Sequence, residues 1–340
     1  MEVWVLKGFR IVFPAPNKID IEEFDVKEPS ENEVLIETIA TLISTGTELT
    51  ALTGEFPEQS AWSAYVKYPF LPGYSGVGKV IKCGSKVKDF MVGDIVAVTS
   101  PHATHAVVRA EQLIKVPENV SVEDACFHTI AAGVMNSVRL AKVSLGESVV
   151  IIGLGILGQM AIIFSRMAGA YPVIALDVAE NRLKIAKGSG ATHTLRADNW
   201  DNVRKEVKRI TKGRMADKVF EVTGNPNVIP EAITLTRNLG YFIVLSSPRG
   251  RTVMDFHDEV NRPSRTIIGT HFTSQPEYET PYNPWTRKRN TELFFDLLSA
   301  GYLKINHLVS HVYRWHEAEK AYKMLMEDRT RAMGVILLFK

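Results

Sequence analysis

The stretch from Ser148 to Asp177, SVVIIGLGILGQMAIIFSRMAGAYPVIALD, limits the possible folds of this chain more than any other. It begins with an unbroken β-branched run from Val149 to Ile152, which predicts a strand buried on both faces of a parallel sheet. A glycine turn, GLGILG, follows at once, and residues 159–168 have the pattern of a helix. This order of strand, turn and helix is typical of a doubly wound α/β domain.

The glycines of this turn predict a dinucleotide site. Gly153 allows the tight turn, Gly155 lets the backbone approach a pyrophosphate, and Gly158 lets the helix pack close to the strand. The part of the turn that leads into the helix, at Ile156 and Leu157, lies where a helix N-terminus presents unpaired N–H groups and the positive end of a dipole. We therefore expect these residues to hold a diphosphate.

Asp177 predicts which dinucleotide binds. It ends a second buried strand, Val173 to Leu176, where a carboxylate can accept hydrogen bonds from both hydroxyls of an adenosine ribose. The same carboxylate repels a 2′-phosphate, so the prediction is NAD and not NADP. Arg182 weakens the prediction of NAD, since it can reach a 2′-phosphate if Asp177 moves aside. The alternative for the whole stretch is a glycine turn in an α/β core with an incidental aspartate.

Length and composition exclude several classes of protein. A chain of 340 residues is long enough for two domains, and a net charge of +2 gives no electrostatic reason to expect nucleic acid or an anionic membrane. No apolar run reaches the roughly twenty residues that cross a bilayer, and the first residues lack the layout of a signal peptide. We expect a cytoplasmic protein. Cys83 and Cys126 suit a reducing compartment and cannot form a four-cysteine zinc site.

The first part of the chain, residues 1–135, has short alternating segments separated by Pro, Gly, Asn and Asp, which predicts a compact β-barrel. The predicted strands are Val3 to Leu6, Arg10 to Phe13, Glu33 to Ile39, Gly76 to Cys83 and Ile95 to Thr99.

From Val143 onward strands alternate with helices, which predicts a doubly wound parallel sheet. Beyond Val149 to Ile152 and Val173 to Leu176, the predicted strands are Lys218 to Glu221, Tyr241 to Leu245 and Thr266 to Ile268, with helices at 180–189, 201–211 and 228–236. Helices near 289–300 and 315–327 and a strand at Gly334 to Phe339 follow. Because a final strand usually pairs with a sheet formed earlier, the predicted domains are 1–135 with 287–340, and 136–286.

Several motifs along nearly the whole chain carry a family resemblance. They are ISTGTE at 43–48, LPGYSGVGKV at 71–80, VGDIVAV at 92–98, GESVVIIGLGILGQ at 146–159 and FEVTGNP at 220–226. The chain resembles the medium-chain dehydrogenase/reductase superfamily, the alcohol and polyol dehydrogenases. The resemblance implies a GroES-like catalytic domain, a Rossmann nucleotide domain and an NAD(P)-dependent oxidoreductase.

The chain departs from this family at the catalytic zinc. Where zinc members have a cysteine, a histidine and a third ligand, this sequence has Ser44 or Thr45, Tyr74 and His128. Hydroxyls and a phenol are poor substitutes for thiolate and imidazole, and the cysteine lobe of the structural zinc is missing as well. We predict no zinc; the alternative is a rearranged site that uses His128 and Glu48.

Without zinc, other groups must remove a proton and stabilise a developing alkoxide. Tyr74 can donate a hydrogen bond to the substrate oxygen, His128 can accept the proton, and Thr47 matches the hydroxyl that relays protons in the relatives. Glu48 can polarise Thr47 or bind a substrate hydroxyl. Each has a structural alternative: Tyr74 can fill the space of the metal, His128 can be a core histidine, and Glu48 can be a buried acceptor.

Other polar residues have weaker cases. His102 and His105 are more often packing or solvent residues at this spacing, His271 follows the last strand of the nucleotide domain and can meet substrate, and the run 286–290 is more typical of a solvated face. Arg287 and Arg289 are the candidates if the substrate carries a phosphate. For the nicotinamide half of the cofactor, the resemblance implies backbone contacts at four residues that follow parallel strands: Val222, Thr223, Gly224 and Ser246.

The sequence thus predicts an NAD-dependent enzyme that interconverts a secondary alcohol, such as a polyol or sugar derivative, and its ketone without catalytic zinc. Its partners are a small-molecule substrate and further copies of itself, as a dimer or tetramer. One alternative is an NADPH-dependent quinone or enone reductase, which Asp177 disfavours. Another is a catalytically silent nucleotide-binding redox sensor.

Overall fold

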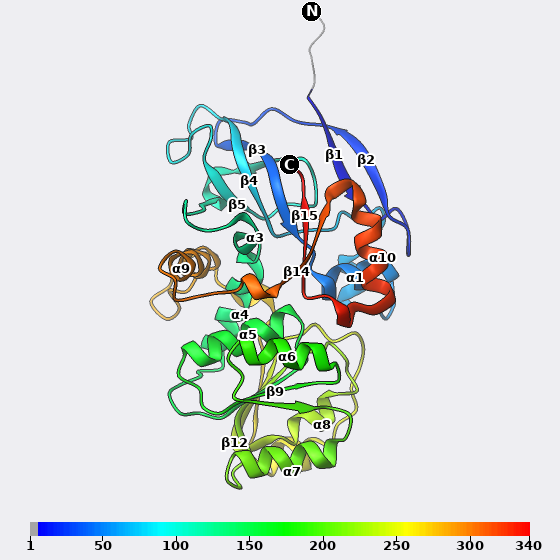
Figure 1. The fold of residues 1–340 in the computed structure, drawn as a ribbon, viewed down its shortest axis with the longest axis vertical. Coiled ribbons are helices and arrows are strands. Elements are labelled where there is room, and N and C mark those ends of the chain that lie inside the picture. The colour runs from blue at the N-terminus through cyan, green and yellow to red at the C-terminus, as the bar shows by residue number, and fades with distance from the viewer. Residues whose placement is uncertain (1–5) are drawn as a thin grey trace, which may run out of the picture. The chain divides into compact units, whose positions relative to one another are not determined.

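The computed structural model describes residues 6–340, so the predicted strand at Val3 to Leu6 lies outside the described residues except for Leu6. The chain forms two compact units (Figure 1). The first consists of Met1–Ile130 and Thr291–Lys340, and the second of Ala131–Asn290. The two divisions fall inside helices, α4 (His128–Leu140) and α9 (Arg287–Ser299).

A sheet of seven strands forms the body of the first unit. Its order is β14-β15-β3-β4-β5-β7, with β6 paired to β3 outside this path. The strands are β3 (Glu33–Leu42), β4 (Gly76–Cys83), β5 (Ile95–Val98), β6 (His105–Arg109), β7 (Ile114–Lys115), β14 (Val309–Arg314) and β15 (Gly334–Leu338). A separate hairpin joins β1 (Lys7–Val12) to β2 (Asp20–Asp25).

The last strand of the chain returns to this sheet, as expected. β15 pairs antiparallel with β3, with Ile336 opposite Leu42, and parallel with β14. Its side chains at Val335 and Leu337 are fully buried in a core that also holds α1 (Thr45–Thr53) and α10 (Ala318–Asp328). Two shorter helices, α2 (Ala61–Tyr65) and α3 (Val122–Ala125), complete the unit.

The second unit is a doubly wound parallel sheet of six strands in the order β10-β9-β8-β11-β12-β13, the strand order of a Rossmann domain. The strands are β8 (Val149–Ile152), β9 (Val173–Asp177), β10 (His193–Arg196), β11 (Ala216–Glu221), β12 (Thr236–Val244) and β13 (Thr266–Gly269). The helices between them are α5 (Ile156–Met167), α6 (Glu180–Gly188), α7 (Trp200–Ile210) and α8 (Ile229–Ile233). Figure 1 shows α5 and α6 on one face of the sheet and α7 and α8 on the other.

Most predicted elements exist, but several boundaries differ from the predicted ones, most clearly between α8 and β12. The sequence predicts a helix over 228–236, whereas α8 ends at Ile233 and Thr236 already begins β12. Thr236 is a β-branched residue that pairs with Ala216 of β11 and is fully buried, so sheet pairing prevails there over the helical pattern. Among the described residues, no helix is both long and apolar enough to cross a membrane.

Candidate active site

The glycine turn between β8 and α5 is built around one very close backbone contact. A Cβ on Gly158 would lie 2.0 Å from the carbonyl oxygen of Gly153, so the helix can approach the turn only through a glycine. Gly153 has a φ of +92° and no room for a side chain beside Thr223. At Gly155 no atom of the described chain lies within 4 Å of a built Cβ, which leaves the space that a pyrophosphate needs.

Asp177 is fixed against this turn. Its Oδ2 accepts a hydrogen bond from the backbone N–H of Leu154 at 2.7 Å, and its Oδ1 accepts one from Ala179 at 2.9 Å. Nη1 of Arg182 lies 3.9 Å from Oδ2. The carboxylate is 7% exposed, so it is held rigidly at the end of β9 beside the turn. In this position it can accept hydrogen bonds from the hydroxyls of a ribose.

Gln159 was not singled out from the sequence and connects these parts. It is fully buried on α5, and its Nε2 donates to the carbonyl oxygens of Leu154 and Arg182 at 3.1 and 3.2 Å. Its Oε1 accepts from the hydroxyl of Ser189. A polar residue directly after the last glycine, in a run that is otherwise apolar up to Phe164, is the signal that could have identified it.

The carboxyl ends of β11 and β12 are joined by another residue that the sequence analysis missed, Glu221. Its side chain is fully buried and accepts hydrogen bonds from the N–H and hydroxyl of Thr223 and from the hydroxyl of Ser246. Two of the residues predicted to contact the cofactor are therefore brought together by one carboxylate. Val222 and Gly224 flank Thr223 in the same turn, and Gly224 has a φ of +70°.

In the first unit, the residues predicted from the zinc-ligand positions also gather. Ser44 precedes α1, and the hydroxyl of Tyr74 donates a hydrogen bond to its Oγ. Thr47 lies on the first turn of α1, partly exposed, and its hydroxyl also hydrogen-bonds to Tyr74. Burial raises the pKa of Tyr74 to about 12, more than these two hydroxyls lower it. At neutral pH Tyr74 is therefore a proton donor and not a base.

His128, at the third zinc-ligand position of the family, is the first residue of α4. The hydroxyl of its neighbour Thr129 donates to the carbonyl oxygen of Tyr74 at 3.2 Å, which ties α4 to the segment before β4. His128 itself is 5% exposed, and its ring lies 6.4 Å from that of Phe295. The structure thus places His128 next to Thr129, the residue that contacts the backbone of Tyr74, with the ring of Phe295 near its imidazole.

Glu48 is the centre of a buried polar cluster. Its Oε1 accepts from the N–H of Ser44 at 2.8 Å, and its Oε2 accepts from Tyr322 at 2.5 Å and from Nε2 of His102 at 3.0 Å. Because a carboxylate only accepts, Nε2 of His102 carries a proton, and its Nδ1 lies 2.7 Å from the hydroxyl of Thr41.

This cluster positions the turn and does not face solvent. Glu48, His102 and Tyr322 are 1%, 0% and 0% exposed. The structure therefore favours the alternative in which Glu48 is a buried acceptor that holds Ser44 and the start of α1. Gly73 belongs to the same arrangement, since a Cβ there would lie 2.6 Å from the backbone nitrogen of His102. Tyr322 was missed because 274 residues separate it from Glu48.

The remaining candidates have partners of their own. His271 is exposed and its Nδ1 lies 2.8 Å from the hydroxyl of Thr273. Arg289 stacks on Trp285 and pairs with Glu279 at 3.7 Å, while Arg287 lies over Phe272. His105 lies on β6, where burial lowers its pKa.

The donor set does not suit a catalytic zinc. The three gathered positions supply a hydroxyl, a phenol and one imidazole, whereas zinc takes thiolate, imidazole and carboxylate ligands. Within residues 6–340 no group of three or more His, Cys, Asp and Glu side chains is arranged to hold a metal. Glu48, the other proposed ligand, has its oxygens engaged by Ser44, His102 and Tyr322.

A β-rich unit with a Rossmann unit that carries a glycine turn defines the class of two-domain, nicotinamide-dependent oxidoreductases. Comparison with known sequences gives the family: residues 30–135 match the alcohol dehydrogenase GroES-like domain, and residues 157–287 match the family described as zinc-binding dehydrogenase. The chain belongs to the medium-chain dehydrogenase/reductase superfamily, as the sequence motifs indicated, and it is an alcohol dehydrogenase-like oxidoreductase.

Similar proteins cover almost the whole chain. D-guloside 3-dehydrogenase of Escherichia coli K12 is 28% identical, over 96% of this chain and 99% of the relative. L-threonine 3-dehydrogenase of Pyrococcus furiosus is also 28% identical, over 92% and 93%. A solved structure, described as a short chain alcohol dehydrogenase from E. coli CFT073 with NADH, has a TM-score of 0.82 at 18% identity, over 98% and 99%.

We predict that Gly155→Ala and Gly158→Ala separate cofactor binding from folding. Gly155→Ala should weaken NADH binding about tenfold, because the methyl group enters the space for the pyrophosphate, and leave the free energy of unfolding nearly unchanged. Gly158→Ala should weaken NADH binding and also lower the free energy of unfolding, because α5 must move away from Gly153. Fluorescence titration and urea unfolding measure the two effects, and equal loss of stability in both variants would contradict this prediction.

We also predict that the folded state loses stability above about pH 10. Burial raises the pKa of Tyr74 to about 12 and that of Tyr322 well above its usual value. The unfolded chain then releases protons that the folded chain retains, so stability falls by up to about 1.4 kcal/mol per pH unit for each phenol. Urea unfolding between about pH 9 and 11 should show a shallower loss for Tyr74→Phe than for the parent chain; parallel curves would contradict the assignment.

Proposed function

We propose that this protein is an NAD-dependent dehydrogenase that interconverts a secondary alcohol and its ketone by hydride transfer, with side chains in place of a catalytic zinc. The observation that carries the proposal is the set of contacts of Tyr74, whose hydroxyl hydrogen-bonds to Ser44 and Thr47 and whose carbonyl oxygen accepts from Thr129, the neighbour of His128. These groups can donate, relay and accept a proton. The likeness to D-guloside 3-dehydrogenase supports a polyol or sugar derivative as substrate.

The chemistry requires two things of the chain. Bound nicotinamide accepts the hydride, so the protein must take up the hydroxyl proton and stabilise the negative charge that develops on the substrate oxygen. Tyr74 stays protonated, because its pKa is about 12, and can donate a hydrogen bond to that oxygen when the substrate replaces Ser44 as its acceptor. His128 can accept the proton, directly or through the hydroxyl of Thr47. Glu48 contributes indirectly, because it holds the backbone of Ser44, the residue whose hydroxyl contacts Tyr74.

The choice of NAD follows from the fixed carboxylate of Asp177. Because Leu154 and Ala179 hold both of its oxygens, the carboxylate cannot swing aside to admit a 2′-phosphate without breaking two hydrogen bonds. Arg182 at 3.9 Å reduces the repulsion only in part.

We predict that NADH binds at least about tenfold more tightly than NADPH. Asp177→Asn should reduce this preference because it removes the repelling charge, whereas Arg182→Ala should increase it because it removes the compensating cation. Both affinities can be measured from the fluorescence of the five tryptophans. Equal binding of the two nucleotides to the parent chain would favour the NADPH-dependent reductase instead.

We predict that Tyr74→Phe and His128→Ala each lower turnover about a hundredfold. Turnover is followed by the absorbance of reduced nicotinamide on a panel of polyols and ketones. Tyr302→Phe, which removes a phenol that is 80% exposed, is the matched control and should leave turnover unchanged.

The same protein preparation tests the metal and the alternatives. Elemental analysis should find less than one zinc per chain, and dialysis against a chelator should leave turnover intact. Stoichiometric zinc whose removal abolishes turnover would overturn the mechanism. NADH binding with no turnover on any substrate of the panel would support the silent nucleotide-binding alternative.

A further inference from the structure

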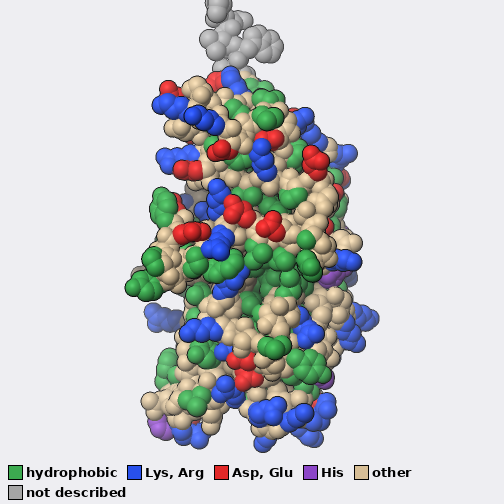
Figure 2. Space-filling view, turned by 90° about the vertical axis from the view of Figure 1, so that its left-hand side faces the viewer, with side chains coloured by type: hydrophobic (Ala, Val, Ile, Leu, Met, Phe, Trp, Pro, Cys, Tyr) green, Lys and Arg blue, Asp and Glu red, His purple; other side chains and the backbone are tan. Residues whose placement is uncertain are grey.

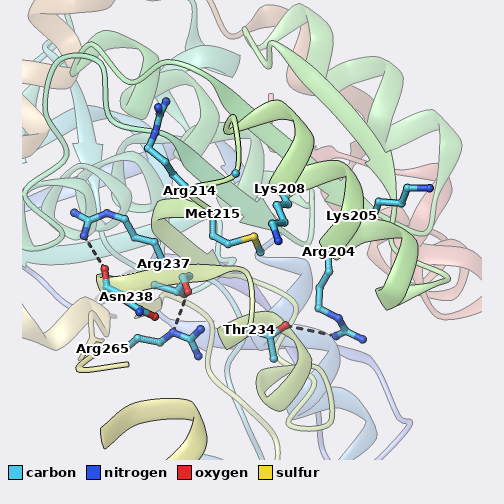
Figure 3. A pocket seen from close by; sticks show the side chains of 11 residues that line it. Arg204, Lys205, Lys208, Arg214, Met215, Thr234, Arg237, Asn238 and Arg265 are labelled. Carbon is cyan, nitrogen blue, oxygen red and sulfur yellow. Dashed lines mark hydrogen bonds between the residues drawn. The ribbon is translucent and has the colours of Figure 1, made fainter. Parts of the chain in front are cut away.

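A basic hollow of about 620 Å³ opens on the second unit, at the amino ends of β11 and β12 (Figure 3). Six of the described side chains that line it are cationic and none is acidic. They are Arg204, Lys205 and Lys208 of α7, Arg214 of the following turn, Arg237 of β12, and Arg265, which directly precedes β13. Figure 2 shows Lys and Arg side chains gathered at the lower end of the molecule, where Figure 1 places α7.

Three of these cations are neutralised by carboxylates outside the hollow. Arg204 pairs with Glu231 and Asp201, both at 2.6 Å, Arg237 pairs with Asp217 at 2.6 Å, and Arg265 pairs with Glu259 at 2.9 Å. These pairs hold the guanidinium groups in fixed positions.

The other three cations have no such partner. Lys205, Lys208 and Arg214 are exposed, and none of them forms an ion pair in the described part of the chain. Three positive charges without an ion pair, of which only Lys205 has a carboxylate beside it among the described residues, in Glu206, create a potential around one concave surface that attracts an anion. Repulsion among them disfavours the empty state, and a bound anion would remove it.

An independent feature inside the hollow also indicates a ligand. Thr236 is fully buried, lines the hollow, and its Oγ1 has no hydrogen-bond partner among the described residues. Such a buried hydroxyl destabilises the fold unless something accepts its proton. An oxygen of an anion bound in the hollow would do so once the lining opens to this hydroxyl, which the surface covers in the structure.

The turn that carries Arg214 is held in place by its own hydrogen bonds. Gly213 donates its N–H to the carbonyl oxygen of Lys208 at 2.7 Å, and Met215 donates its N–H to the hydroxyl of Thr211 at 3.0 Å. The cation is therefore presented from an ordered segment beside α7, which lowers the entropy cost of binding.

The hollow is distinct from the cofactor site of the same unit. It lies at Ala216 and Thr236, the first residues of β11 and β12, whereas the glycine turn follows the carboxyl end of β8. Because β8 and β11 are parallel neighbours, the two sites lie at opposite ends of the strands. The length of a six-residue strand puts them about 20 Å apart.

We propose that this hollow binds a small molecule that carries at least two phosphoryl groups, either a nucleoside polyphosphate or a short inorganic polyphosphate. Its volume lies within the usual range for small-molecule sites, and three free cations with a buried hydroxyl match several oxyanions in one ligand. Arginine forks and lysine ammonium groups both bind phosphoryl oxygens well. The proposal is independent of the alcohol substrate.

The experiment is calorimetric titration of the full chain with inorganic tripolyphosphate and, separately, ATP, each with saturating NADH so that the glycine turn is occupied. Tripolyphosphate should bind at least about tenfold more tightly than orthophosphate, and more weakly as salt rises. Tighter binding of ATP identifies the nucleoside form as the ligand, and equal binding identifies the phosphoryl chain.

Variants distinguish binding at a specific site from general attraction of anions to a basic surface. Lys208→Ala and Arg214→Ala should each weaken tripolyphosphate binding about tenfold, whereas Lys187→Ala, an exposed cation of α6 outside the hollow, should not. Thr236→Val keeps the shape of a side chain whose hydroxyl has no partner, so it should weaken binding without lowering the free energy of unfolding.

Three results would overturn the proposal. They are no binding of either probe, binding that Thr236→Val and Lys208→Ala leave unchanged, and binding of a short RNA that is tighter than that of both probes and depends on the same residues. The last result would assign the surface to a nucleic acid instead of a small molecule.

Discussion

A buried carboxylate that accepts a hydrogen bond from a backbone N–H fixes each turn on which the candidate site depends. Glu48 accepts from Ser44, Asp177 from Leu154, and Glu221 from Thr223. All three carboxylates are at most 7% exposed. Buried charge of this kind is tolerated only when it is fully hydrogen-bonded, so each turn and its carboxylate stabilise one another. The hydroxyls and N–H groups proposed to meet cofactor and substrate are positioned by these three groups.

The sequence predicted the parts of this arrangement that are local. The glycine turn, Asp177 and the strand before them lie within thirty residues of one another, and their spacing alone implies how they fold. Tyr74 and His128 were predicted from the family motifs, and the fold brings Thr129, the neighbour of His128, to the backbone of Tyr74.

Residues that act through long-range contacts could not be found in this way. Tyr322 contacts Glu48 across 274 residues, and no local pattern in α10 distinguishes its phenol from an ordinary core aromatic. His102 was interpreted from its sequence neighbours as a packing or loop residue, and only the fold shows that it shares a carboxylate with Tyr322. The basic hollow was missed for the same reason, since its cations come from α7, β12 and the segment before β13.

The pairing of β15 with β3 has a consequence for how the chain is made. The first unit joins residues near position 40 to residues near position 336, so its sheet and the hydroxyl that Glu48 requires are incomplete until α10 and β15 have been synthesised. The second unit is one continuous segment and can fold on the ribosome before that point. During synthesis the edge of β3 at 40–42 therefore stays unpaired until β15 follows, and an unpaired strand edge can pair with another chain.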